Sequence, residues 1–167
     1  MITDKLNEPW DLYDRKFNLV GKQRRKDPVP HGLYHLTVAL LVFDGHGRLL
    51  VQRRSPHKLH RPGCWDLAAG GSALRGESSA QAAARELHEE LGLTADFTQE
   101  SPVATLWHAS WVEVVYQVTF PGLTVAQLVL QKSEVAAVAL LPLPAATARL
   151  AGSDTDWAAV VQRARHD

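Results

Sequence analysis

The sequence predicts a single α/β domain that spans residues 1–167. Runs rich in apolar and β-branched residues alternate with turn residues, as strands do, while two other segments have the spacing of amphipathic helices. The 167 residues, 46% of them hydrophobic, are enough to bury a core without metal or disulfide support. The single cysteine excludes a disulfide framework within the chain.

The strand segments share short length, apolar character and flanking Gly, Pro or Asp residues. The first belongs to an N-terminal extension, residues 1–30, and predicts a hairpin that turns at Arg15 and Lys16. The next two, separated by Gly45-His46-Gly47, are expected to pair as a hairpin, and Pro142 and Pro144 end the last. In chain order the segments are residues 12–22, 34–44, 48–53, 65–69, 103–108, 112–120 and 134–141.

Two helices are expected. Ser78 and Gln81 form a capping-box pattern and Gly92 suits a left-handed C-cap, so a helix of about three to four turns fits between them. Residues 155–165 have helical periodicity, with Asp154 or Thr155 as the cap. The buried stripe of the first helix is predicted to consist of Ala80, Ala83, Ala84, Leu87 and Leu91.

Glu86, Glu89 and Glu90 lie at i, i+3 and i+4 on another side of this helix. Their like charges repel unless a cation compensates, and oxygen-only carboxylate clusters suit Mg²⁺ or Mn²⁺. The alternative is a solvated acidic helix face. The glycines at 70 and 71 favour a metal site, because they let the backbone approach a metal closely.

The run from Gly71 to Leu93 has the spacing G-x5-E-x7-R-E-U-x-E-E-x-G-U, where U is aliphatic, and it resembles a complete Nudix box. The resemblance implies an α/β/α sandwich with a mixed sheet, containing the loop-helix-loop of the box. It also implies Mg²⁺- or Mn²⁺-dependent hydrolysis of a nucleoside diphosphate linked to a group X. The implied metal ligands are Glu86, Glu90, Glu89 and a carbonyl of Gly70 or Gly71, and the structural residues of the box are Gly71, Glu77, Arg85 and Gly92.

The run RRSPHKLHRPGCWDLAAGG from Arg53, together with YHLTVALLVFD, resembles the isopentenyl-diphosphate-isomerase-like branch of the superfamily. The resemblance implies that Arg54 and Lys58 contact the substrate diphosphate; a solvated loop is the alternative. Isomerase activity is the weaker hypothesis, because Gly70 stands where the isomerases need a cysteine. Cys64 lies elsewhere and is expected to be a small strand residue.

The general base is expected to be Glu89, with Glu113 and Glu134 as candidates outside the box. His35 occupies the position of a histidine metal ligand in the isomerases, but a substrate contact or a hydrogen-bonded strand histidine is expected instead.

Aromatic side chains are the expected contacts for a nucleobase. Trp107, Trp111 and Tyr116 lie close together in the sequence, and Trp10 and Tyr13 could reach in from the hairpin. Packing in the core is the alternative for most of the tryptophans.

The expected partner is a small-molecule nucleotide diphosphate. The formal net charge of zero, a pI near 7.1 and the lack of any recognised nucleic-acid module argue against nucleic-acid binding. No apolar stretch is long enough to cross a membrane, so a cytoplasmic location is expected. A non-catalytic nucleotide-binding module remains a third hypothesis, and the sequence leaves the oligomeric state open.

Overall fold

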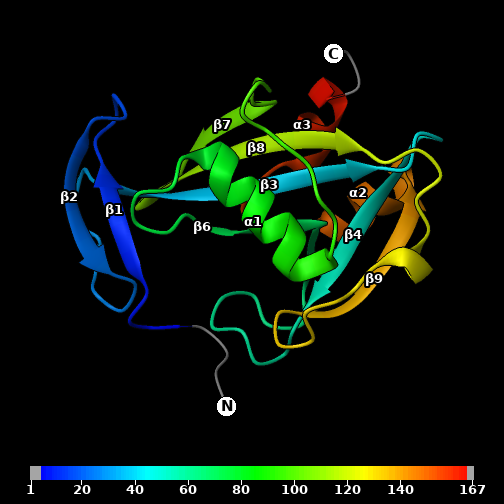
Figure 1. Ribbon diagram of the computed structural model, residues 1–167, viewed down its shortest axis with the longest axis horizontal. Coiled ribbons are helices and arrows are strands. Elements are labelled where there is room, and N and C mark those ends of the chain that lie inside the picture. The colour runs from blue at the N-terminus through cyan, green and yellow to red at the C-terminus, as the bar shows by residue number, and fades with distance from the viewer. Residues whose placement is uncertain (1–4, 165–167) are drawn as a thin grey trace.

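The computed structural model describes residues 5–164, in which nine strands join into one mixed sheet (Figure 1). The central strand β3 pairs in parallel with β8 and antiparallel with β1, β4 and β6. In chain order the elements are β1 Pro9–Tyr13, β2 Leu19–Arg24, β3 Tyr34–Phe43, β4 Arg48–Arg54, β5 Trp65–Leu67, β6 Ala69–Ser72, α1 Ser79–Leu91, β7 Ala104–Trp107, β8 Trp111–Thr119, the 3-10 helix η1 Val125–Gln127, β9 Val135–Pro142, α2 Leu143–Leu150 and α3 Trp157–Ala164.

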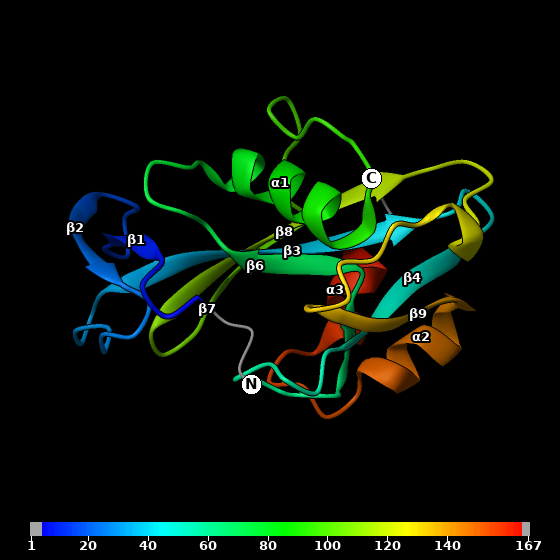
Figure 2. The same cartoon turned by 60° about the horizontal axis from the view of Figure 1, so that its bottom comes forward.

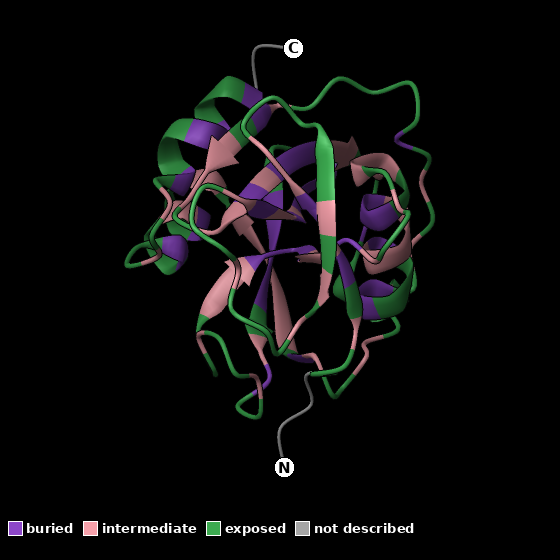
Figure 3. Cartoon of the chain, turned by 90° about the vertical axis from the view of Figure 1, so that its left-hand side faces the viewer, coloured by how far each residue is buried: buried purple, intermediate pink, exposed green. Residues whose placement is uncertain are grey.

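Helix α1 covers one face of the sheet, and α2 and α3 cover the other (Figure 2). The predicted α/β/α sandwich with a mixed sheet is therefore confirmed. Each face has its own hydrophobic core: Leu40 and Leu87 belong to the core under α1, whereas Leu41 and Trp157 belong to the core under α3. Strand β3 is buried on both faces, as Figure 3 shows by burial class, which explains its nearly continuous apolar sequence.

Helix α1 begins and ends where the sequence predicts. The Ser78 side chain accepts a hydrogen bond from the Gln81 backbone N–H, and the Gln81 side-chain oxygen accepts one from the Ser78 backbone N–H. Gly92 adopts the left-handed conformation at φ 71°. The buried stripe differs from the prediction. Ala82 and Glu90 are buried, while two of the predicted alanines are only partly buried.

The strands depart from the prediction at three places. The N-terminal hairpin is longer than residues 12–22, since β1 and β2 pair from Pro9 to Arg24. Strands β3 and β4 form a hairpin in which only two residue pairs are in register, and β4 then pairs with β5 and β9. The prediction of a single strand at 65–69 is wrong, because this segment belongs to two strands. The first, β5, pairs with β4, and the second, β6, pairs with β3.

The C-terminal region contains a helix that the sequence analysis missed. Pro142 and Pro144, which were expected only to end β9, also begin α2, because proline suits the first turn of a helix. The predicted caps of α3 are wrong as well. Asp156 accepts a hydrogen bond from the Ala159 backbone at 3.2 Å, and α3 begins at Trp157. The end of the predicted helix, Arg165, lies outside the described residues.

No helix within residues 5–164 combines the length and apolar character needed to cross a bilayer.

Candidate active site

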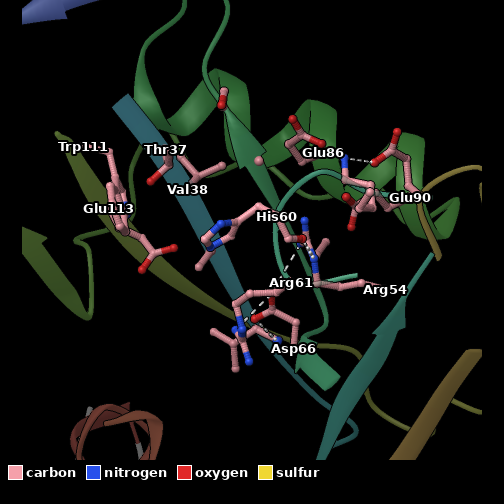
Figure 4. A pocket seen from close by; sticks show the side chains of 18 of the residues that line it. Thr37, Val38, Arg54, His60, Arg61, Asp66, Glu86, Glu90, Trp111 and Glu113 are labelled. Carbon is pink, nitrogen blue, oxygen red and sulfur yellow. Dashed lines mark hydrogen bonds and ion pairs between the residues drawn. The ribbon is translucent and has the colours of Figure 1, made fainter. Parts of the chain in front are cut away.

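A cavity of about 340 Å³ lies where α1, β3 and β6 face the segment between β4 and β5. It gathers side chains from distant parts of the sequence. Figure 4 shows Glu86 and Glu90 of α1 on one side with Arg54 below Glu90, Trp111 and Glu113 of β8 on the other side, and Asp66 in the lower middle. The predicted site residues that line the cavity are His35, Arg54, Lys58, Gly70, Gly71, Arg85, Glu86, Glu89, Glu90, Trp111, Glu113 and Glu134.

The three glutamates of α1 differ in exposure. Glu90 is buried and its carboxylate accepts a hydrogen bond of 2.7 Å from the Gln52 side-chain amide of β4. Glu86 is mostly buried, with 12% of its side chain exposed, whereas Glu89 is 44% exposed at the mouth of the cavity. The carboxylates therefore run from the core side of the helix to the cavity mouth.

Burial raises the pKa of two of these carboxyls. It raises the pKa of Glu86 to about 7, although the neighbouring Arg85 guanidinium acts in the opposite direction. It raises the pKa of Glu90 well above the ordinary value, and the nearby negative charge of Glu86 raises it further. Because both neighbouring carboxyls resist ionisation, an added positive charge would stabilise their ionised forms.

The two glycines of β6 have no room for a side chain. A Cβ on Gly71 would lie 2.4 Å from the Glu86 Oε1 atom, and a Cβ on Gly70 would lie 2.5 Å from the Val38 carbonyl oxygen. Glycine at 71 lets the Glu86 carboxylate lie directly against the β6 backbone. Glycine at 70 permits the close pairing of β6 with β3, in which it lies opposite Ala39.

Arg85 joins the loop of the predicted box to the helix. Its guanidinium donates two hydrogen bonds to the Glu77 carboxylate, at 2.7 and 2.9 Å, and one to Glu86 at 2.9 Å. It also donates to the Ser72 carbonyl oxygen at 3.1 Å. Its hydrogen bond to Glu89 is longer, at 3.5 Å. These bonds hold the Glu86 carboxylate in place relative to the loop.

Basic residues line the cavity beside the carboxylates. Lys58 forms a close ion pair with Glu134, which places this candidate base at the cavity but engages one of its oxygens. Arg54 donates to the His60 carbonyl oxygen at 3.1 Å, and its guanidinium lies 3.4 Å from an oxygen of Asp66.

Two pairs of stacked aromatic rings line another part of the cavity. The Trp10 and His35 rings stack at a centroid distance of 4.0 Å, and the Trp111 and His108 rings at 4.2 Å. The His108 Nε2 atom lies 3.6 Å from the carboxylate of Glu113, the other candidate base. Burial lowers the pKa of His35 to about 4, so this ring is neutral at pH 7.

Three predicted aromatic contacts are not brought to the cavity. Trp107 packs against Phe17 and Tyr34 and does not line the cavity, so its role as a substrate contact stays a prediction. Tyr116 is buried under α1, where its hydroxyl lies 2.8 Å from that of Ser79, and Tyr13 packs against the same core. Cys64 is exposed in the turn before β5, outside any strand.

Sequence analysis missed Gln52, Arg61, Asp66 and His108, all of which line the cavity. Gln52 could have been noticed as a polar residue directly after an apolar strand run. The other three carried no signal that separates them from surface residues.

The donor set fits a hard divalent cation. Glu86 and Glu90 supply carboxylate oxygens, Glu86 lies directly against the β6 backbone at Gly71, and a third carboxylate, Glu89, also lines the cavity. Within residues 5–164, no three acidic, histidine or cysteine side chains converge as a complete metal site. A cation would therefore have to take further oxygens from the backbone, from water or from a substrate.

Known proteins resemble this chain over most of its length. A family model described as the NUDIX domain matches residues 33–161. A Nudix hydrolase of Listeria monocytogenes is 37% identical over 130 residues, which are 77% of this chain and 76% of the relative. An isopentenyl-diphosphate Delta-isomerase of Serratia proteamaculans is 33% identical over 117 residues, which are 70% of this chain and 59% of that protein. The solved structure of DR0079 from Deinococcus radiodurans matches with a TM-score of 0.75 at 25% identity, covering 93% of this chain and 98% of that one.

Proposed function

The chain belongs to the Nudix hydrolase family, and from this premise we propose that it hydrolyses a diphosphate linkage in a nucleoside di- or triphosphate or a related nucleoside diphosphate derivative. Enzymes of this family use divalent metal ions, and the proposed ion is Mg²⁺ or Mn²⁺. The observation that carries the proposal is the pair of buried carboxylates, Glu86 against the Gly71 backbone and Glu90 against Gln52, within one cavity with the basic residues.

In the proposed reaction Glu86 and Glu90 would hold the cation, with a carbonyl of Gly70 or Gly71 as a further ligand and Glu89 as either another ligand or the base. When bound, a divalent cation lowers the pKa of a coordinated water and offsets charge on the phosphoryl oxygens. Arg54 and Lys58 orient the phosphate groups and balance their charge.

An oxygen of water bonds to one phosphorus while the bond from that phosphorus to the bridging oxygen breaks. The base accepts the proton of the water, and the products are a nucleotide and the phosphate of X. Glu89 is the first candidate base, because it lines the cavity, 44% of its side chain is exposed, and its contact with Arg85 is long, at 3.5 Å. Glu113 is the second candidate, since it lines the cavity on β8. Glu134 is the third, because its ion pair with Lys58 must loosen first.

Isomerisation of isopentenyl diphosphate is a second candidate because of the 33% identity to an isomerase. The geometry at position 70 disfavours it. A cysteine there would place its Cβ 2.5 Å from the Val38 carbonyl oxygen, so β6 would have to move away from β3. A non-catalytic nucleotide-binding module is the third candidate, although it would need no buried acidic pair. A cytoplasmic location belongs to the same proposal.

The test is a panel of nucleoside diphosphates, triphosphates, nucleotide sugars and isopentenyl diphosphate, assayed with Mg²⁺ and Mn²⁺. We expect cleavage of at least one nucleotide, and a loss of about 100-fold or more in Glu86→Gln and Glu90→Gln. Glu100→Gln, an exposed carboxylate outside the cavity, is the matched control and should retain full activity. Cleavage of no nucleotide at any pH, or full activity in both α1 variants, would overturn the proposal. Isomerisation without hydrolysis would establish the second candidate.

A further inference from the structure

Two arginines of the cavity share one carboxylate. Asp66 Oδ2 lies 3.4 Å from the Arg54 guanidinium and 3.7 Å from that of Arg61. All three side chains are about four-fifths buried, with exposures of 17% for Arg54, 20% for Arg61 and 22% for Asp66. A single carboxylate cannot neutralise two guanidiniums, so this group carries a net positive charge on the cavity wall (Figure 4).

The backbone of Arg61 is strained to reach this position. Its φ of 46° lies in the left-handed region, which residues with long side chains rarely adopt. Such strain persists only where the surrounding structure enforces it, and it is concentrated at binding and active sites. Side chains of β4 hold the loop in this shape: the Arg53 Nε atom donates to the Gly63 carbonyl oxygen at 3.0 Å, and the Arg54 Nε atom to that of His60 at 3.1 Å.

Among residues 5–164, the contacts of the Arg61 guanidinium are long. Besides Asp66 at 3.7 Å, the guanidinium donates to the Trp65 carbonyl oxygen at 3.4 Å. A guanidinium has five N–H donors in a planar fork, and these two contacts leave most of its hydrogen-bonding capacity unused. The strained loop therefore places the Arg61 guanidinium in the cavity with most of its N–H donors available to a ligand.

We propose that Arg61 and Arg54, bridged by Asp66, form an oxyanion-binding site for a phosphate group of the substrate. Asp66 serves as an internal anion that keeps the two guanidiniums together and competes with the phosphate for them. Paired guanidinium forks match the oxygens of a phosphate, which offers more acceptors than one carboxylate. The choice of phosphate rests on the proposed function.

The position of the two arginines, Arg54 and Arg61, fits the binding of a chain of phosphate groups. In Figure 4, Arg61 and Asp66 lie between the Glu86 and Glu90 side of the cavity and the Trp111 and Glu113 side. A substrate whose phosphates begin at the α1 carboxylates would pass the two arginines on its way to the aromatic wall. Arg61 thus extends the diphosphate contacts expected of Arg54 and Lys58.

The first test is the binding of inorganic pyrophosphate, measured calorimetrically at low salt, in EDTA and again with Mg²⁺. Arg61→Asn removes the guanidinium without adding strain, because asparagine tolerates the left-handed region better than most residues. We expect it to weaken pyrophosphate binding about 10-fold or more, the usual effect of losing a charge-assisted hydrogen bond. Asp66→Asn should act in the opposite direction and tighten binding about 3- to 10-fold, because it removes the competing anion.

Arg53→Gln is the matched control, since Arg53 bonds the same loop but does not line the cavity. It should leave pyrophosphate affinity unchanged. If Arg53→Gln and Arg61→Asn weaken binding equally, Arg61 only supports the loop and the proposal fails. It also fails if Asp66→Asn weakens binding or if Arg61→Asn leaves the affinity unchanged. Should Arg61→Asn not fold, Arg61→Lys keeps the charge without the fork, and an affinity equal to that of the parent would overturn the proposal.

The outcome is separable from that of the proposed hydrolysis, because binding of pyrophosphate is measured without turnover. If the parent binds pyrophosphate through Arg61 but cleaves no nucleotide, the oxyanion site stands and the proposed function fails. If the parent cleaves nucleotides while Arg61→Asn leaves both pyrophosphate affinity and KM unchanged, the proposed function stands and the oxyanion site fails.

Discussion

Glu86→Gln should make the metal-free protein more stable at alkaline pH while it removes activity. The pKa of Glu86 is raised because its carboxyl is buried, so the folded protein favours the protonated acid. A carboxyl with a raised pKa stabilises the fold below its ordinary pKa, and this contribution is lost as the pH rises through the folded-state value. Glutamine resembles the protonated acid at every pH and avoids that loss.

The magnitude follows from the size of the rise. The pKa of Glu86 moves from 4.5 to about 7. Since one unit of pKa corresponds to about 1.4 kcal/mol, full ionisation of this carboxyl costs the folded protein about 3 kcal/mol. Glu86→Gln should therefore be about 3 kcal/mol more stable than the parent at pH 8 and nearly equal to it at pH 4.5. Arg85 keeps its two hydrogen bonds to Glu77 in the variant, so the loop stays anchored.

Urea unfolding in EDTA between pH 4.5 and pH 8, followed by circular dichroism, measures this difference. The comparison of parent and variant at each pH cancels the titration of groups that both proteins share. Addition of Mg²⁺ at pH 8 should stabilise the parent more than the variant, because only the parent gains a partner for the Glu86 charge. A stability difference that is zero at pH 8, or that stays constant with pH, would refute the reasoning that burial holds this carboxyl protonated.

Three further predictions concern other parts of the site and its helix. Burial lowers the pKa of His35 to about 4, so the free energy of unfolding should fall by about 3 kcal/mol as the pH falls from 6.5 towards 4. Urea unfolding should show a smaller fall in His35→Gln, which has no imidazole to protonate. Gly71→Ala places a Cβ 2.4 Å from Glu86 Oε1, so kcat/KM for nucleotide cleavage should fall about 100-fold while circular dichroism shows a retained fold. Ser78→Ala removes the cap bond to Gln81 and should lower the free energy of unfolding by about 1 kcal/mol with unchanged kcat/KM; a larger loss of activity than of stability would contradict a purely structural role.

The sequence was sufficient to predict features that local chemistry decides. Helix α1 was located correctly because its caps, Ser78, Gln81 and Gly92, act within a few residues of the helix ends. Features that depend on partners far along the chain were not predictable. The split of β5 from β6 requires the knowledge that one pairs with β4 and the other with β3. Proline at 142 and 144 was ambiguous, because proline both ends strands and begins helices.

The same distinction applies to the site. The acidic residues of α1 were identified from their spacing, because neighbouring positions on a helix surface follow from the sequence alone. Their unequal burial was not predictable, since it depends on how α1 packs over β4 and β6. Arg61 and Asp66 were missed because only the folded loop between β4 and β5 brings them together. Trp107 was assigned to the substrate by its proximity to Trp111, but the turn between β7 and β8 directs it to the other side of the hairpin.

The surroundings of Glu90 show how the fold accommodates a buried carboxyl whose ionised form would destabilise it. A buried carboxylate is costly unless its charge is balanced, and the one hydrogen bond from Gln52 is from a neutral amide. A glutamine side chain has both donor and acceptor atoms, so it can donate to the ionised acid or, with the amide reversed, accept from the protonated acid. Gln52 therefore satisfies Glu90 in either state. Because the pKa values of both carboxyls are raised, the fold can hold the two acids with protons still bound, and a cation that binds their ionised forms displaces these protons.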